Sequence, residues 1–161
     1  IYDETAEKYL DFDASAESAG FSWYELSNWA KPGGECRHNI AYWDGSYWWG
    51  IGPGAHSYLN GRRWWNVKHP VTYQSALNEG KSPIADSEIL SDENLRAEFL
   101  MLQIRMKFGI ELNKLELKQQ AQAKNFRDSG HIDSSEWARG RLALTPSGRL
   151  IADRIVRELM V

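Results

Sequence analysis

Apolar positions recur at three- and four-residue steps near the start of the chain and then give way to a short aromatic run. Within residues 2–18 these positions alternate with Glu, Asp and Lys, which predicts an amphipathic helix that Gly20 ends. The run "FSWYEL", residues 21–26, has the length and aromatic content of a strand. A helix followed by a strand is the rhythm of an α/β sheet, and "SNWAKPGGE", residues 27–35, has the composition of a loop.

An Asn-Gly pair separates two aromatic runs in the middle of the chain. Residues 47–59, "YWWGIGPGAHSYL", and residues 62–68, "RRWWNVK", flank Asn60 and Gly61. Both residues of the pair tolerate positive φ, so the pattern predicts a β-hairpin with a two-residue turn. A Trp-Trp doublet lies on each arm, and we expect these rings to pack across the strands.

The pattern changes character after the hairpin. A short helix is followed by the polar, Pro-containing residues 81–90, which we predict to be a linker. This linker would separate a first domain, residues 1–80, from a second domain, residues 91–161.

The second domain is predicted to be mainly helical. Its expected elements are a helix from Ser91 to Gly109, helices at 112–119 and 121–129, a hairpin within 131–144, and a last helix opened by Thr145 and Pro146. The side chains expected to face its core are Leu95, Phe99, Leu102, Met106, Leu150, Ile151, Ile155 and Leu159. Three helices, a hairpin and a helix are the order of a winged-helix-like module.

Charge and hydropathy restrict the class of protein. The 161 residues are 42% hydrophobic and include no apolar run of about 18 residues, so we expect a globular, cytoplasmic protein without a transmembrane segment. Peripheral membrane association and a homodimer are left open. The net charge is -3, and residues 92–161 carry 12 basic against 10 acidic side chains without a basic stripe, so nucleic acid is not an expected partner.

A single cysteine, Cys36, excludes an internal disulfide and any Cys-only cluster or four-Cys zinc site supplied by this chain. Its neighbours Arg37 and His38 would lower a thiol pKa only if they faced it, and adjacent side chains seldom do, so a Cys nucleophile is disfavoured. The chain opens on Ile1 inside a helical pattern, from which we expect a piece of a longer protein.

Candidate chemistry concentrates in residues 35–57. His38 offers an axial ligand for haem iron, and Tyr42 and Trp43 offer walls for the flat macrocycle if the segment forms a helical turn. Asn39 would hold the loop geometry or the imidazole tautomer. From composition alone a structural role for His38 is favoured, because one histidine before aromatic residues occurs by chance.

The glycine-rich stretch "GIGPGA", residues 50–55, allows close approach of a ligand or another strand to the backbone. It lacks the Lys-Ser/Thr ending of a phosphate loop, and an extended segment rather than a helix follows it. We therefore expect it to be structural, with His56 as a loop histidine.

Four segments together resemble one family. They are "YELSNWAKPGGECRHNIAYW", "YWWGIGPGAHS", "SDENLRAEFLMLQIRMKFGIEL" and "LTPSGRLIADRIVREL". Together they are similar to the C-terminal half of radical SAM proteins of the oxygen-independent coproporphyrinogen III oxidase family, and within it to the HemW haem chaperones. The most specific element is "HNIAYW", which fits the HNxxYW signature that the chaperones have and the oxidases lack.

The resemblance implies an α/β fragment: the last elements of a partial (β/α) radical SAM barrel with an antiparallel hairpin, then a helical, winged-helix-like C-terminal domain. It implies that His38 ligates haem iron, that Asn39, Tyr42 and Trp43 belong to the same haem site, and that Ala30 contacts S-adenosylmethionine. The intact parent would also hold S-adenosylmethionine and a [4Fe-4S] cluster.

One departure from the family is decisive for catalysis. The CxxxCxxC motif that ligates the cluster is absent, so we expect no catalytic residue and no radical chemistry in this chain. The leading hypothesis is a haem-binding and haem-transfer part of a HemW-like protein that supplies respiratory haemoproteins. The alternatives are a portion of an oxygen-independent coproporphyrinogen III oxidase and a nucleic-acid-binding winged helix, which the charge disfavours.

Overall fold

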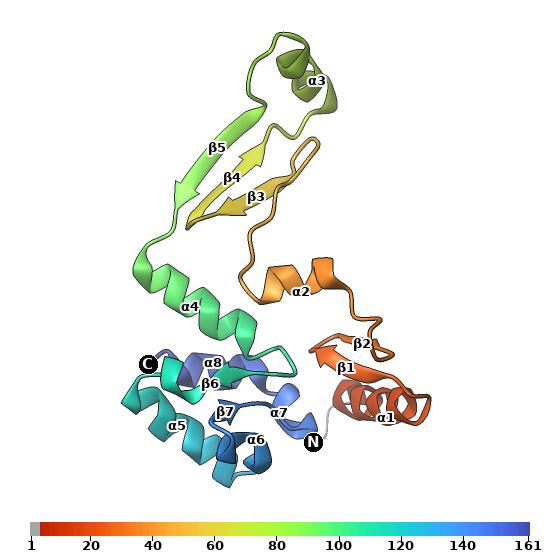
Figure 1. Ribbon diagram of the computed structural model, residues 1–161, viewed down its shortest axis with the longest axis vertical. Coiled ribbons are helices and arrows are strands. Elements are labelled where there is room, and N and C mark those ends of the chain that lie inside the picture. Colours follow the sequence, from red (N-terminus) through yellow and green to blue (C-terminus); the bar gives the residue numbers. More distant parts are fainter. Residues whose placement is uncertain (1–3) are drawn as a thin grey trace. The chain divides into compact units, whose positions relative to one another are not determined.

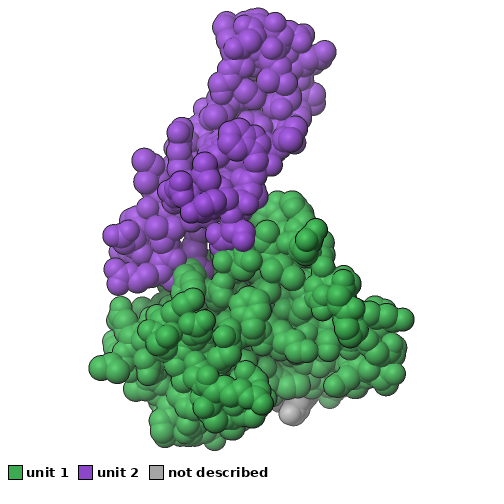
Figure 2. Space-filling model, in the orientation of Figure 1, with its two compact units in different colours: residues 1–44, 99–161 green, residues 45–98 purple. Residues whose placement is uncertain are grey.

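The computed structural model describes residues 4–161, which divide into two compact units. Unit 1 comprises residues up to 44 together with 99–161, and unit 2 comprises residues 45–98 (Figure 2). The helices are α1 (Glu4–Ser18), α2 (Arg37–Trp43), α3 (Pro70–Asn78), α4 (Asp92–Gln103), η1 (Leu112–Lys114), α5 (Leu117–Asp128), α6 (Ser134–Ala138), α7 (Pro146–Arg149) and α8 (Ala152–Leu159) (Figure 1). The strands are β1 (Ser22–Glu25), β2 (Asn28–Ala30), β3 (His56–Leu59), β4 (Arg62–Asn66), β5 (Ile84–Ile89), β6 (Ile110–Glu111) and β7 (Arg141–Leu142).

A two-stranded hairpin follows α1 in unit 1. The expected strand over 21–26 is confirmed as β1, but the expected loop over 27–35 is wrong where residues 28–30 form β2. The two strands are antiparallel, with Trp23 opposite Trp29. Antiparallel strands need only a short connection, and Asn and Ala next to a Trp gave no periodic signal for so short a strand.

A buried arginine connects α1 to α7 within unit 1. Arg149 is 3% exposed, donates hydrogen bonds to both carboxylate oxygens of Asp13 and to the Tyr9 hydroxyl, and lies 4.5 Å from the centroid of the Trp23 ring. Trp29 donates its indole N–H to the same carboxylate at 2.6 Å. The hydrogen bonds from Arg149, helped by Trp29, hold the pKa of Asp13 below its usual value against the opposing effect of burial. Burial raises the pKa of the Tyr9 hydroxyl.

The apolar core of unit 1 lies among the helices and short strands of residues 99–161. It consists of Leu100, Ile104, Ile110, Leu115, Ala123, Phe126, Ile132, Leu142, Leu144, Ala152, Ile155, Val156 and Leu159. Of the side chains expected to face it, Ile155 and Leu159 belong to it, and Phe99 and Ile151 pack against it partly buried. Leu100 and Ile104 were not singled out from the sequence, and α4 ends at Gln103, before the Gly109 expected.

Two elements of this region differ from expectation. The hairpin expected within 131–144 is reduced to one antiparallel bridge between Ile132 and Leu144. The Asp133 carboxylate accepts hydrogen bonds from the next turn and starts α6, and β7 pairs with β6. The helix expected over 112–119 is wrong. A single 3-10 turn, η1, is followed at Glu116 by a capping box with Gln119 that opens α5.

Thr145 and Pro146 do open a helix, as predicted. The Thr145 hydroxyl accepts a hydrogen bond from the Gly148 N–H at 3.1 Å, and Pro146 is the first helical residue. The expected single helix is divided, because Ile151, at φ −121° and ψ 21°, interrupts it between α7 and α8.

Gly109 should be intolerant of any side chain. Its φ is +59°, and a Cβ there would lie 1.9 Å from the Leu142 carbonyl oxygen, so Gly109→Ala must displace the β6–β7 pair. We expect it to lower the free energy of unfolding, measured by urea denaturation, by well over about 1 kcal/mol. Gly130 is the matched control, since its φ is +81° but a Cβ there would meet nothing within 4 Å. If Gly109→Ala and Gly130→Ala lowered the free energy of unfolding equally, the close approach of Gly109 to the Leu142 carbonyl would be contradicted.

Unit 2 contains a three-stranded antiparallel sheet in the order β3-β4-β5. The hairpin turn is confirmed, with Asn60 at φ 50° and Gly61 at φ 75°. Only His56–Leu59 of the expected first arm is a strand, although Trp48 adds an isolated bridge to Tyr58. The expected linker over 81–90 contains β5, which pairs along β4. As the third strand of the order its side chains are mostly exposed, which explains its loop-like polar composition.

Aromatic rings pack across this sheet as expected. The Trp49 and Trp64 rings meet edge to face with centroids 5.1 Å apart. His56 stacks on Trp65 at 5.7 Å. These contacts account for the aromatic richness of the hairpin.

Candidate functional site

The HNxxYW segment forms helix α2. The helix starts after Cys36, whose backbone is extended, and ends at Asp44. Successive residues of an α-helix are rotated by about 100°, so side chains four apart share a face and adjacent ones do not. The spacing of the signature therefore sets His38 beside Tyr42 and Asn39 beside Trp43, on two different faces.

The first of these faces is open. His38 is exposed, and its ring lies edge to face with the Tyr42 ring at a centroid distance of 5.1 Å. Tyr42 is 40% exposed. Within residues 4–161 the ring nitrogens of His38 have no hydrogen-bond or ion-pair partner. The imidazole is thus held by an aromatic neighbour while its nitrogens stay accessible to a ligand.

The second face is attached to the rest of unit 1. The Asn39 amide donates to the Tyr24 hydroxyl at 3.3 Å and to the Glu25 carboxylate at 3.4 Å. The Trp43 carbonyl accepts a hydrogen bond from the Gln103 amide at 3.4 Å. The Trp43 indole nitrogen is enclosed and has no partner among the described residues. Asn39 therefore ties α2 to β1.

Glu25 is a buried carboxylate that sequence reasoning missed. It is 1% exposed and accepts hydrogen bonds from the Ser27 N–H at 3.2 Å and from the amides of Asn28 and Asn39. It also forms a backbone bridge with Met106. A Glu within a short aromatic strand, three residues before an Asn, was the available signal, but only the fold shows that its side chain is enclosed.

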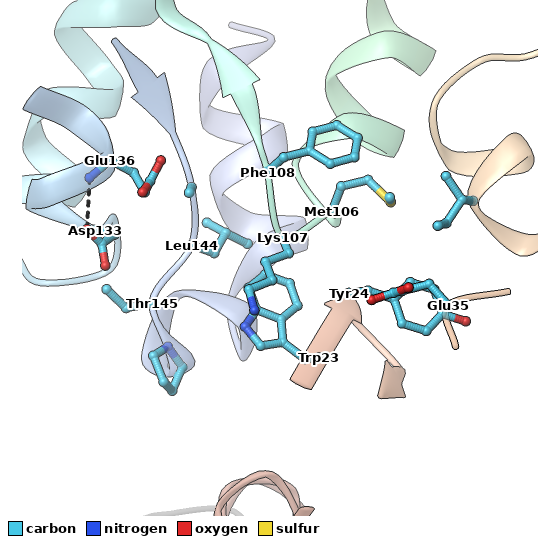
Figure 3. Close-up of a pocket in the computed structure, with 13 residues that line it drawn as sticks. Trp23, Tyr24, Glu35, Met106, Lys107, Phe108, Asp133, Glu136, Leu144 and Thr145 are labelled. Carbon is cyan, nitrogen blue, oxygen red and sulfur yellow. Dashed lines mark hydrogen bonds between the residues drawn. The ribbon is translucent and has the colours of Figure 1, made fainter. Parts of the chain in front are cut away.

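A cavity of about 580 Å³ lies in unit 1, and Ile40 of α2 lines it whereas His38 does not (Figure 3). Its lining is mostly apolar and aromatic, and its volume is typical of small-ligand sites. The lining residues are Trp23, Tyr24, Glu35, Ile40, Met106, Lys107, Phe108, Asp133, Glu136, Ala143, Leu144, Thr145 and Pro146. Ile40, two residues from His38, is rotated by about 200° from it, which is why the histidine does not reach this space.

Most polar groups of the cavity already have protein partners. Asp133 caps α6, Glu136 pairs with Arg139, and the Lys107 ammonium donates to the Ser22 hydroxyl at 3.2 Å. Figure 3 shows the hydrogen bond between Asp133 and Glu136 on one side and the Trp23, Tyr24 and Phe108 rings on the other. The cavity thus offers apolar surface more than free charge.

The other singled-out residues lie apart from the open face of α2. Ala30 is 7% exposed at the end of β2, opposite Ser22, and does not line the cavity. Cys36 is exposed and precedes α2 without a side-chain cap hydrogen bond. The glycine-rich loop is held by its own unit, since the Gly50 N–H donates to the Ser57 hydroxyl at 2.9 Å and the Gly52 N–H to the Tyr73 hydroxyl at 3.2 Å.

A metal cluster does not fit the residues present. Among residues 4–161 no group of three or more His, Cys, Asp or Glu side chains is placed to hold a metal ion. The chain has one cysteine, whereas a [4Fe-4S] cluster needs several thiolates. In the same described part, no helix is long and apolar enough to cross a membrane.

Comparisons with known proteins identify the group. The chain is 46% identical over 158 residues to the heme chaperone HemW of Mycobacterium tuberculosis, covering 98% of this chain and 40% of that protein. The chain is HemW-like. The HemW of Bacillus subtilis is 29% identical over 161 residues, which covers 95% of this chain and 42% of the relative. No family model matches the HemW-like sequence.

The fold of the HemW-like chain has a relative of known structure. Coproporphyrinogen III oxidase (HemN) from Escherichia coli, a radical SAM enzyme, matches with a TM-score of 0.62 at 15% identity, over 94% of this chain and 40% of that one. This similarity shows a mixed helix-and-strand fold of that kind. The chain spans about two fifths of the length of these relatives.

Proposed function

We propose that this chain contributes haem binding to a HemW-like haem chaperone, with His38 as the axial ligand of the haem iron. The observation that carries the proposal is the accessible His38 imidazole on α2, packed edge to face against Tyr42 and without a partner at its nitrogens in the described residues. A neutral imidazole nitrogen is a common ligand of haem iron. The name of these relatives, heme chaperone, agrees with it.

The residues of α2 suit a cargo site. An exposed histidine can bind and release haem directly, whereas release from a buried histidine would require part of the chain to unfold. Tyr42 limits rotation of the imidazole and offers an apolar edge for the macrocycle. Transfer to respiratory haemoproteins and a cytoplasmic, membrane-peripheral place are parts of the same proposal.

Other cofactors belong to the intact parent in this proposal. The cluster would come from outside this chain, because the residues here do not fit it. A contact between Ala30 and S-adenosylmethionine, and the assignment of the hairpin to a partial barrel and of residues 91–161 to a winged-helix-like domain, stay predictions from the resemblance. A role as part of a coproporphyrinogen III oxidase has only the fold similarity behind it.

A haemin titration followed at the Soret band tests His38. We expect the chain to bind haemin with a histidine-type spectrum and His38→Ala to weaken binding by more than about tenfold, since even the loss of an outer partner of a metal ligand costs that much. His69→Ala is the matched control, because His69 is also exposed and makes no side-chain cap hydrogen bond.

Equal haemin affinity in the chain and in His38→Ala would show that His38 is not the ligand. The same conclusion follows if His69→Ala loses binding as strongly as His38→Ala. Circular dichroism of each variant confirms that the comparison is made between folded chains.

A further inference from the structure

One hydrogen-bonded group connects the signature helix to the hairpin before it. Asn39, on α2, donates its amide both to the Tyr24 hydroxyl and to the Glu25 carboxylate of β1, at 3.3 and 3.4 Å. We call Tyr24, Glu25 and Asn39 the β1–α2 clasp. All three side chains lie in unit 1 and are buried or partly buried.

Burial of the Glu25 carboxylate makes the hydrogen bonds of the clasp important for stability. The Glu25 carboxylate is 1% exposed, so each hydrogen bond it accepts replaces one to water that the fold removed. Two of its donors, Ser27 and Asn28, come from its own hairpin. Asn39 is the donor that comes from α2. The carboxylate therefore accepts this hydrogen bond only when α2 has one particular rotation about its axis.

That rotation decides where His38 points. His38 and Asn39 are adjacent in the helix, so the direction of the Asn39 side chain fixes that of the His38 side chain at about 100° from it. A second tie, from Gln103 to the Trp43 carbonyl, holds the other end of the same helix. With α2 so attached, Ile40 lines the cavity and His38 does not.

We propose that Asn39 is a positioning residue, which acts through Glu25 and Tyr24 to hold α2 in the orientation that presents His38, and that it does not itself touch haem. The inference rests on the proposed haem site at His38. It assigns the signature residues to two roles: His38 and Tyr42 meet the ligand, while Asn39 anchors the helix.

A double-mutant cycle between Asn39→Ala and Glu25→Gln tests this assignment. We expect each single variant to weaken haemin binding by about tenfold, the lower end for partners of a metal ligand, and the double variant to be no weaker than the worse single one. Asn28→Ala is the matched control, since it removes the same kind of amide from the same carboxylate but from outside α2. It should weaken haemin binding less than Asn39→Ala does, because the hydrogen bonds from Asn39 to Glu25 and Tyr24 stay in place.

Hydrogen exchange of the α2 amides without haem is the second measurement. Exchange should accelerate in Asn39→Ala and Glu25→Gln and stay slow in His38→Ala. Additive losses of haemin affinity with unchanged α2 exchange would mean that Asn39 contacts haem directly, and would overturn the inference. If the parent chain does not bind haemin, the proposed function fails. The clasp is then decided by exchange alone, where unaltered rates in Asn39→Ala refute it.

Discussion

Asp13→Ala is expected to lower the free energy of unfolding by about 3–5 kcal/mol at neutral pH, because it leaves a buried guanidinium without its counter-charge. The Arg149 side chain is 1% exposed and the Asp13 side chain 16% exposed, so neither can turn to water without moving α1 or α7. Urea denaturation at pH 7 measures the loss. Asp11→Ala is the matched control, since Asp11 is an exposed carboxylate on the same helix, and it should change little.

The pH dependence of this loss separates the ion pair from packing. Hydrogen bonds from Arg149 depress the folded-state pKa of Asp13 below its ordinary value of 3.8. A depressed carboxyl pKa adds stability that is complete above the unfolded value and is lost as pH falls through the folded one. The curves for the parent chain and Asp13→Ala should therefore converge below about pH 4. Curves that stay parallel down to about pH 2 would show that the carboxylate charge is not the cause.

Ile155→Ala is expected to cost about 2–5 kcal/mol, because it opens a cavity at the centre of the helical core. Ile155 is 0% exposed on α8 and belongs to the cluster that also holds Phe126 of α5 and Leu142 of β7. Leu117→Ala is the control, since Leu117 is 84% exposed at the start of α5. Thermal melting compares the two, and a loss in Leu117→Ala equal to that in Ile155→Ala would contradict this core.

Local signals in the sequence predicted turns and caps well. Asn60 and Gly61 both adopt positive φ, and this depends on the two residues themselves rather than on distant partners. The turn they form is as expected. Thr145 caps α7 by a bond to Gly148, three residues on. Such features are decided within a few residues, so a single sequence contains their cause.

Elements stabilised by distant partners were predicted poorly. Strand β5 has the composition of a polar linker. Its backbone hydrogen bonds with β4, rather than the properties of its own side chains, make it a strand. Residues 131–137 were expected to be one arm of a hairpin, but only Ile132 pairs with Leu144, and the Asp133 cap starts α6 at Ser134. Short apolar segments fit either pattern, and their tertiary neighbours decide between them.

The candidate site was foreseen as a set of residues but not as an arrangement. The sequence placed His38, Asn39, Tyr42 and Trp43 in one signature, and their roles at haem stay a prediction. It did not show that Glu25, which lies 14 residues earlier, accepts a hydrogen bond from Asn39. Nor did it show that Arg149 meets Asp13, which is 136 residues away.

By itself the sequence determined the HemW-like signature, the absence of cluster ligands in this chain and the local turns, because each depends on residue identity or on spacing of a few residues. Tertiary structure alone decided which pair of signature residues is exposed and which is attached, and which charges are buried. Hydrogen bonds and burial depend on groups that only folding brings together, so the outward direction of His38 is a property of the clasp between α2 and β1 rather than of the motif.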